Sequence, residues 1–339
     1  MVNKEGKYGL IMVVWEITRK CNLRCKTCCS SSGKALRDEL NHKECLKVLN
    51  QIIEAGAKML FFSGGEPLLH KHIIEYTKKA SEAGLRVFTA TNGTIITKEL
   101  IKKLKEAGME EMHFSIDGPT AELNNEIRGK GIFRKVIQRI EIAKKEGMRV
   151  VMVSVITSLT KTNSVIEKFF ELALKLEVDA LSLERFIPSG RGARNRYLAL
   201  TKEQNKKILK LIYRKKKKLE GKLLISSGDP LKCLLDPNYP KGPYKNVYGG
   251  CGAGVASLCI TPTGDVTPCP VLMIKVGNVR KDNLKNLWLN SELFLKLRNR
   301  DNLKGKCGKC PKRNICGGCR GTAYNLRGDY LETDPMCWI

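Results

Sequence analysis

The stretch LIMVVWEITRKCNLRCKTC, residues 10–28, decides the fold. It begins with the apolar, β-branched run Leu10–Ile17, which predicts a buried strand. Three cysteines follow almost at once, Cys21, Cys25 and Cys28, with the spacing Cys-x3-Cys-x2-Cys. A strand that leads into a thiol-rich loop places metal ligands at the carboxyl end of a sheet, where α/β proteins carry their functional groups.

The same alternation of apolar strands and helical periods continues to about residue 200. Five further strands are predicted, at Lys58–Phe62, Arg86–Ala90, Glu111–Ile116, Arg149–Ile156 and Ala180–Phe186. Helices are predicted between them, near residues 41–55, 70–83, 97–107, 132–146 and 163–176. This order indicates an α/β protein with a parallel sheet and right-handed crossovers. The pattern fits both an open doubly wound sheet and an incomplete barrel.

The texture of the chain changes after residue 220, where Gly, Pro, Asn and Cys become dense. A hairpin is predicted from Ser257–Thr261 and Asp265–Thr267, and an amphipathic helix over Leu284–Arg298, before a cysteine-rich tail. Because this part is poor in core-forming residues, bound metal clusters would supply part of its stability. We therefore expect two domains, residues 1–220 and 221–339.

Composition narrows the class of protein. With 339 residues and 42% hydrophobic content, the chain can bury a large core. It contains neither a run of 18 apolar residues nor a signal-peptide pattern, so we expect a cytoplasmic protein without a membrane partner. Fourteen cysteines in such a chain indicate metal ligands and not disulfides.

The formal charge of +27 indicates either an anionic partner or a lysine-rich solvated surface. In Lys206–Lys218 the apolar residues have helical spacing, so the lysines form the wet face of a helix. Basic residues interleaved with aromatic ones, as in RNA-binding motifs, are absent, and a nucleic-acid partner is not expected.

The first cysteine motif can hold three irons of a 4Fe–4S cubane and leave the fourth iron open to a ligand. A zinc site is the alternative, although zinc usually takes four protein ligands in a structural site. After the second strand comes Ser63-Gly64-Gly65-Glu66-Pro67, whose paired glycines let the backbone approach a ligand closely.

Polar residues also follow the third and fourth strands. Asn92, Ser115 and Asp117 can hydrogen-bond a ribose or a substrate, and the alternative is ordinary turn chemistry at Asn-Gly and Asp-Gly. Arg128 is either a partner for a carboxylate or an exposed side chain.

A second cysteine pattern follows residue 250 and exceeds the needs of one cluster. Its members are Cys251, Cys269, Cys307, Cys310, Cys316, Cys319 and Cys337. Two zinc sites of four ligands each are the alternative to iron–sulfur clusters.

Together these motifs resemble the radical S-adenosylmethionine (SAM) superfamily with a SPASM-type extension. The resemblance implies an incomplete (β/α)6 TIM-type barrel with a small cysteine-rich, cluster-bound C-terminal domain. It also implies SAM bound to the fourth iron of one catalytic 4Fe–4S cluster, and one or two auxiliary 4Fe–4S clusters. The GGEP-like motif would contact the SAM ammonium, and the implied cofactor-binding residues are Gly64, Gly65, Glu66, Asn92, Ser115, Asp117 and Arg128.

The resemblance also divides the later cysteines between two clusters. One cluster would be held by Cys307, Cys310, Cys316 and Cys337. The other would be held by Cys251, Cys269 and Cys319, with its fourth ligand missing or supplied by Cys233 or Cys259. The family's usual Cys-x3-Cys ending is shortened here to Cys316-x2-Cys319, which affects the partition. The remaining Cys29 and Cys45 are expected to be structural.

The opening residues 15–23 and 30–33 resemble mycofactocin-type peptide maturases. The ending resembles these and also the alternative-haem-pathway enzymes, which trim carboxylate side chains of tetrapyrroles. We therefore expect an oxidoreductase that forms a 5′-deoxyadenosyl radical and abstracts hydrogen from a peptide or protein, with auxiliary clusters carrying electrons. A tetrapyrrole decarboxylase or deacetylase is the alternative.

A non-catalytic iron–sulfur regulator or nucleic-acid-binding protein is a third hypothesis, which the GGEP-like motif disfavours. A reductant such as flavodoxin or ferredoxin is an expected partner. The sequence identifies no catalytic acid or base.

Overall fold

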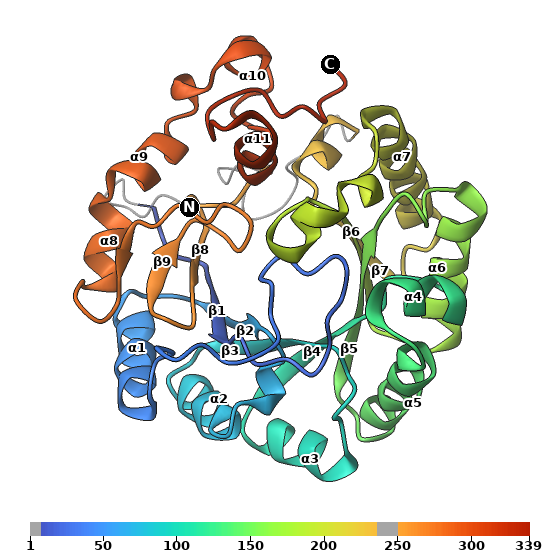
Figure 1. Cartoon of the computed structure of the whole chain (residues 1–339), viewed down its shortest axis with the longest axis vertical. Helices are drawn as coiled ribbons and strands as arrows, with labels where there is room; N and C mark the ends of the chain where they lie inside the picture. The colour runs from blue at the N-terminus through green and yellow to red at the C-terminus, as the bar shows by residue number, and fades with distance from the viewer. Residues whose placement is uncertain (1–7, 236–249) are drawn as a thin grey trace.

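The computed structural model describes residues 8–235 and 250–339, and all structural statements concern these residues. Ten strands form one sheet in the order β10-β9-β8-β1-β2-β3-β4-β5-β6-β7 (Figure 1). The strands are β1 (Met12–Thr18), β2 (Met59–Gly64), β3 (Arg86–Thr91), β4 (Met109–Ser115), β5 (Arg149–Ile156), β6 (Ala180–Arg185), β7 (Leu224–Ser226), β8 (Ser257–Ile260), β9 (Asp265–Thr267) and β10 (Gly277–Asn278).

The helices that follow the first six strands lie on the outside of the curved sheet (Figure 1). The α-helices are α1 (His42–Glu54), α2 (Ile73–Glu82), α3 (Lys98–Glu106), α4 (Ala121–Arg128), α5 (Ile132–Lys145), α6 (Asn163–Lys175), α7 (Lys202–Lys218), α8 (Leu284–Asn290), α9 (Glu292–Arg298), α10 (Gly305–Lys309) and α11 (Arg320–Arg327). Four 3-10 segments are η1 (Pro67–Leu69), η2 (Gly190–Leu198), η3 (Pro230–Leu234) and η4 (Arg300–Asn302).

Strands β1 to β7 are all parallel, which confirms the predicted α/β class and the incomplete barrel. Side chains alternate between the two faces of each strand. On β1, Trp15 points to the helices and stacks on Tyr76 of α2, with 6.0 Å between ring centroids. Positions of opposite parity, such as Phe61, His113 and Val153, are less deeply buried and line the inner face, which we call the lumen.

The predicted hairpin is confirmed as β8 and β9, with a turn at Gly264, which has a φ of +85°. It does not stand apart from the barrel, because β8 pairs with β1 in parallel, Val14 opposite Cys259. The indole of Trp288 in α8 also donates a hydrogen bond to the Tyr8 carbonyl, at 2.8 Å. The C-terminal cysteine-rich region is thus joined to the barrel through the sheet, while the division at residue 220 stays a prediction.

Several observed elements differ from the predicted ones, among them β10, α10 and α11, which were not predicted. Strand β7 adds a seventh parallel strand beside β6, and α4 is a helix that was not among the predicted elements. The single helix predicted over Leu284–Arg298 is two helices, because Ser291 adopts an extended conformation and its hydroxyl accepts a hydrogen bond from Phe294 N–H.

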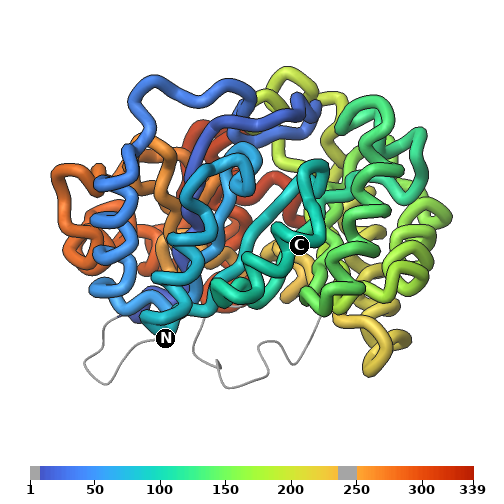
Figure 2. The backbone as a smooth tube through the Cα atoms, turned by 90° about the horizontal axis from the view of Figure 1, so that it is seen from below, coloured from blue at the N-terminus to red at the C-terminus, as the bar shows by residue number. Residues whose placement is uncertain are grey.

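Figure 2 shows the segment between β1 and α1 passing over one end of the barrel. This segment carries the first three cysteines, so the fold places them at the carboxyl ends of the parallel strands, as predicted. No helix in the described part of the chain is both long enough and apolar enough to cross a membrane.

Candidate functional site

All fourteen cysteines are free thiols in the described part of the chain. Cys21, Cys25 and Cys28 lie on the loop after β1 and are close enough to influence one another electrostatically. Burial raises the pKa of the Cys25 thiol to about 11, and the neighbouring thiols of Cys28 and Cys21 add to the rise. Metal binding would replace these protons, as thiolate ligation requires.

The glycine pair after β2 holds the start of this cysteine loop. The amides of Gly65 and Glu66 donate to the carbonyls of Thr18 and Lys20, at 2.7 and 2.8 Å. A Cβ atom at Gly65 would lie 2.1 Å from the Lys20 carbonyl oxygen, so a larger residue cannot occupy this position without moving the loop. The glycine pair therefore allows β2 to approach the cysteine loop closely. This packing role comes in addition to the close approach to a ligand that the sequence predicted.

The Glu66 carboxylate is completely buried and ties β2 to the end of β3. It accepts hydrogen bonds from the Thr91 hydroxyl at 2.8 Å and from the Asn92 amide at 2.7 Å. Burial raises the pKa of Glu66 to about 7. Because the side chain is engaged inside the protein, the groups that this motif can offer to an ammonium ligand are backbone carbonyls.

Asn92 joins the β3 turn to the cysteine loop. Its amide nitrogen donates to the Asn22 side chain at 2.8 Å and lies 3.8 Å from Cys21 Sγ. Its side-chain oxygen accepts a hydrogen bond from the Thr94 amide at 2.9 Å. Asn92 therefore also stabilises the turn after β3, which was the alternative to a ligand-binding role. Ser115 lies half-buried on the lumen face at the end of β4.

Asp117 and Arg128 form a buried ion pair directly behind the cysteine loop, with Nη2 3.0 Å from Oδ2. The other Asp117 oxygen accepts from the Val155 amide at 2.9 Å. Arg128 Nη1 lies 3.9 Å from Cys25 Sγ, which places a cation beside a predicted iron ligand. Arg128 is therefore not the exposed side chain of the alternative reading, and its partner carboxylate belongs to the protein.

The sequence analysis did not predict η2, which contacts the cysteine loop from the side of β6. Arg191 donates to the Cys25 carbonyl at 3.1 Å and also to the Ser32 carbonyl. Asn195 donates to the Lys26 carbonyl at 2.9 Å. Gly190, with a φ of +52°, packs so closely that a Cβ would lie 2.1 Å from the Cys29 carbonyl oxygen. The two glycines that flank Arg191, shortly after the predicted strand Ala180–Phe186, were the available signal.

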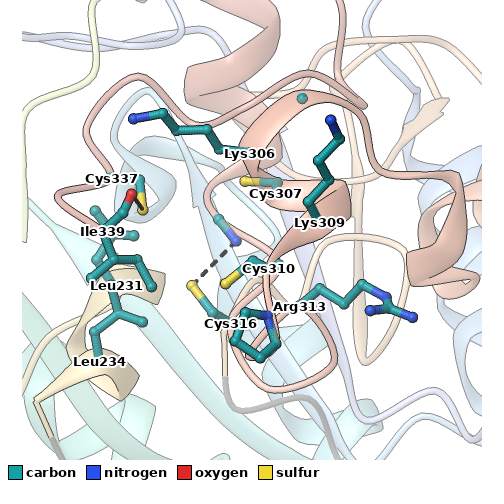
Figure 3. A pocket seen from close by; sticks show the side chains of 14 residues that line it. Leu231, Leu234, Lys306, Cys307, Lys309, Cys310, Arg313, Cys316, Cys337 and Ile339 are labelled. Carbon is teal, nitrogen blue, oxygen red and sulfur yellow. Dashed lines mark hydrogen bonds between the residues drawn. The ribbon is translucent and has the colours of Figure 1, made fainter.

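Four of the later cysteines line one cavity of about 680 Å³ near the C-terminus (Figure 3). They are Cys307, Cys310, Cys316 and Cys337, the set that the family resemblance assigned to one cluster. The side chains of Leu231, Leu234 and Ile339 complete an apolar wall. The cavity has the ligand type and the space that a cubane cluster needs.

The other three later cysteines also lie together. Burial raises the pKa of Cys269 to about 12, and the nearby thiols of Cys251 and Cys319 contribute to the rise. Cys259 is fully buried on β8, close enough to Cys269 for the two thiols to interact. Cys233 lies elsewhere, since its thiol is hydrogen-bonded with that of Cys316. Of the two candidates for the missing fourth ligand, the geometry therefore favours Cys259.

The two cysteines outside these sets, Cys29 and Cys45, lie in different surroundings: Cys45 in the core and Cys29 in the cysteine loop. Cys45 is buried in the core against α1's own turn, as expected for a structural thiol, and donates to the Leu40 carbonyl at 3.5 Å. Cys29 follows Cys28 directly, and its carbonyl packs on Gly190.

Ligand spacing bears on the zinc alternative. A tetrahedral zinc with bonds of about 2.3 Å holds its thiolates about 3.8 Å apart. In the described part of the chain, one group of three metal-ligating side chains has all its ligand atoms within 4.8 Å of one another. It consists of His42, His72 and Glu75 and contains no cysteine. Among the described residues, no three cysteine sulfurs lie within 4.8 Å of one another, so these sets do not have the spacing of an assembled zinc site.

Residues 15–173 match the family model of the Radical SAM superfamily, and residues 251–311 match SPASM, an iron–sulfur cluster-binding domain. The AdoMet-dependent heme synthase of Methanosarcina barkeri is 33% identical over 338 residues, which cover 96% of this chain and 95% of that protein. The mycofactocin maturase MftC of Mycolicibacterium smegmatis is 30% identical over 343 residues, which cover 98% of this chain and 84% of that protein. The crystal structure of Streptococcus suis SuiB bound to its precursor peptide SuiA superposes with a TM-score of 0.80 at 18% identity, covering 100% and 78%.

Proposed function

Because the chain belongs to the radical SAM superfamily and carries a SPASM region, we propose that it oxidatively removes carboxyl groups from the side chains of a tetrapyrrole. The observation that carries this proposal is the full-length likeness to a heme synthase, at 33% identity over 95% of that protein. Sequence reasoning alone had placed a peptide substrate first. We place a tetrapyrrole above a peptide as the substrate because of the likeness to a heme synthase, and because the family resemblance implies that haem-pathway relatives trim carboxylate side chains.

Bound SAM and its catalytic cluster would supply a 5′-deoxyadenosyl radical that takes one hydrogen atom from the substrate. The protein's own part is to hold three irons through Cys21, Cys25 and Cys28. The Asp117–Arg128 pair, and the hydrogen bonds from the Arg191 and Asn195 side chains of η2 to carbonyls of this loop, would hold the reacting atoms in position over the lumen.

Loss of a hydrogen atom and of carbon dioxide leaves one electron that the substrate must give up. The set Cys251, Cys269 and Cys319 is suited to receive this electron because it lies near the lumen. Cys269 is close to Cys259 of β8, and β8 pairs with β1, a strand that lines the lumen. A flavodoxin or ferredoxin would supply the electron that starts the reaction, and a reducing cytoplasmic location suits free thiols and clusters.

The test is an anaerobic reaction with dithionite, SAM and an iron porphyrin that carries propionate side chains. We expect 5′-deoxyadenosine together with a product lighter by carbon dioxide and two hydrogen atoms for each side chain processed. Formation of 5′-deoxyadenosine without a lighter porphyrin would overturn the substrate class. Lack of 5′-deoxyadenosine from fully reconstituted protein would overturn the reaction itself.

A peptide is the second candidate substrate. It is favoured by the likeness to MftC and by the fold of SuiB, which was solved with a precursor peptide. The corresponding test uses peptides encoded by short open reading frames near the gene. A mass loss in such a peptide under the same conditions, with porphyrin unchanged, would establish the peptide in place of the tetrapyrrole.

A further inference from the structure

Three of the four histidines in the chain gather outside the barrel, where α1 and α2 begin. His42 is the first residue of α1, and His72 is the residue that precedes α2. The imidazole rings of His42 and His72 stack with 3.9 Å between their centroids. His70 lies behind them, and its Nδ1 accepts from the His72 amide at 3.4 Å.

Glu75 completes a cluster of nitrogen and oxygen ligands. His72 Nδ1 is 3.1 Å from one Glu75 oxygen, and His42 Nε2 is 3.5 Å from the other. All three ligand atoms lie within 4.8 Å of one another. Bonds of about 2.0–2.1 Å to a tetrahedral ion would place neighbouring ligand atoms about 3.3 Å apart, so the distances are close to those required. The two stacked imidazoles must turn relative to each other so that both lone pairs point at one ion.

The local sequence explains the arrangement. His72 and Glu75 are three residues apart at the start of α2, a spacing that puts both side chains on one face of the first turn. His42 is oriented from behind, because its Nδ1 is hydrogen-bonded to the hydroxyl of Tyr76 at 2.9 Å. The Tyr76 side chain is fully buried and stacked on Trp15, so the imidazole is anchored to the core.

We propose that His42, His72 and Glu75 bind one divalent transition-metal ion of the zinc class, with water as the fourth ligand. With the metal on His42 Nε2, the Nδ1–H group donates to Tyr76, a contact that fixes the tautomer as partners of metal-bound histidines commonly do. The side chains of His42, His72 and Glu75 are 38%, 27% and 49% exposed, which leaves room for the water ligand. Two imidazoles and one carboxylate suit zinc, whereas magnesium and calcium prefer oxygen ligands alone.

The ion would fasten α1 to α2 close to the catalytic end of the barrel. Along the chain η1, His70 and Lys71 separate Glu66 from His72, and the ring of Tyr76 connects the site to Trp15 of β1. This site contains no sulfur ligand and is separate from the cysteine sets. Its ion therefore stabilises the support of the Gly64–Glu66 segment and takes no part in radical chemistry.

Zinc binding to the anaerobically reconstituted holoenzyme tests the proposal, because the cysteines are then occupied by iron. One equivalent of Zn²⁺ is added, free ion is removed, and the zinc content and the zinc K-edge absorption spectrum are measured. We expect one zinc per chain with nitrogen and oxygen ligands near 2.0 Å and without sulfur at about 2.3 Å. A chain without bound zinc, or zinc bound through sulfur, would overturn the site.

Variants assign the ligands. His72→Ala should weaken zinc binding by at least about 100-fold, because it removes a ligand. Tyr76→Phe should weaken it by about 10-fold, because it keeps the ligands and loses the hydroxyl that orients His42 and also contacts the Cys45 thiol. The matched control is Glu82→Gln, which removes an exposed carboxylate at the other end of α2 and should bind zinc as the wild type does. Equal zinc affinity in the wild type and in His72→Ala would mean that the cluster is an ordinary hydrogen-bonded group.

Discussion

At the scale of single residues, the three cysteines after β1 are the groups on which the reaction depends. Replacing Cys21, Cys25 and Cys28 together by Ala should remove one cluster's worth of iron and all formation of 5′-deoxyadenosine. The later cysteine sets lie on other segments and should keep their iron. Iron analysis and a SAM-cleavage assay check this, and residual cleavage in the triple variant would contradict the assignment of the catalytic cluster.

Glu66 should give the stability of the protein a characteristic pH dependence. Burial raises the pKa of its carboxyl from 4.5 to about 7, so the native state holds a proton that the unfolded chain releases at lower pH. This stabilisation is fully present below about pH 4.5 and is lost as the pH rises through about 7, a change of about 3 kcal/mol in the free energy of unfolding.

Denaturant unfolding of wild type and Glu66→Gln at several pH values between 5 and 8 measures the effect. The free energy of unfolding of the wild type should fall relative to that of the variant as the pH rises. The exposed Glu82→Gln variant is the control and should follow the wild type. Parallel curves for wild type and Glu66→Gln would show that this carboxyl does not titrate in the range.

At the scale of elements, the end of β2 and the cysteine loop fit together only because Gly65 lacks a side chain. Gly65→Ala would place a Cβ 2.1 Å from the Lys20 carbonyl oxygen and force the loop away from β2. We expect iron in the catalytic cluster and SAM cleavage to fall by at least about 10-fold, since small misplacements of reacting groups are costly.

Gly56→Ala is the matched control for this change. Gly56 follows α1, has a φ of +75°, and a Cβ there would meet no atom within 4 Å. The substitution should cost about 1 kcal/mol of stability through backbone strain and leave SAM cleavage unchanged. Full activity in Gly65→Ala would mean that the cysteine loop tolerates displacement from β2.

At the scale of the whole molecule, the cysteine-rich region has two parts with different support. Residues up to about 298 are held to the barrel by β8 on β1, and by Arg280, which pairs with Glu44 of α1 at 2.8 Å. The part from α10 onward depends more on its cysteines, four of which line one cavity. Metal binding there is folding free energy.

Cys337→Ser should therefore unfold the last part locally while the barrel stays folded. Limited proteolysis should cut the variant mainly within residues 305–339 and leave β8 and β9 protected. Protection of β8 and β9 is expected because β8 pairs with β1 of the barrel. Wild-type resistance together with unchanged iron would show that Cys337 is not a ligand.

The sequence by itself determined the six strands and their helices, the cysteine loop and the family. The strands, their helices and the cysteine loop depend on local periodicity or on spacing over fewer than ten residues, which a single chain displays directly. The family depends on several such short motifs found together along the chain. The free thiols and the set lining the C-terminal cavity also followed from spacing and resemblance.

Only the tertiary structure decided which of these groups meet. The contacts of Asp117 with Arg128, of Arg191 with the cysteine loop, and of β8 with β1 join residues far apart in sequence, and no periodic signal announces them. The same holds for Cys233, which lies with Cys316, and for His42, which meets Glu75 across two helices. Such contacts arise from how the barrel curves and closes on its own connections, and this geometry is a property of the packed chain as a whole.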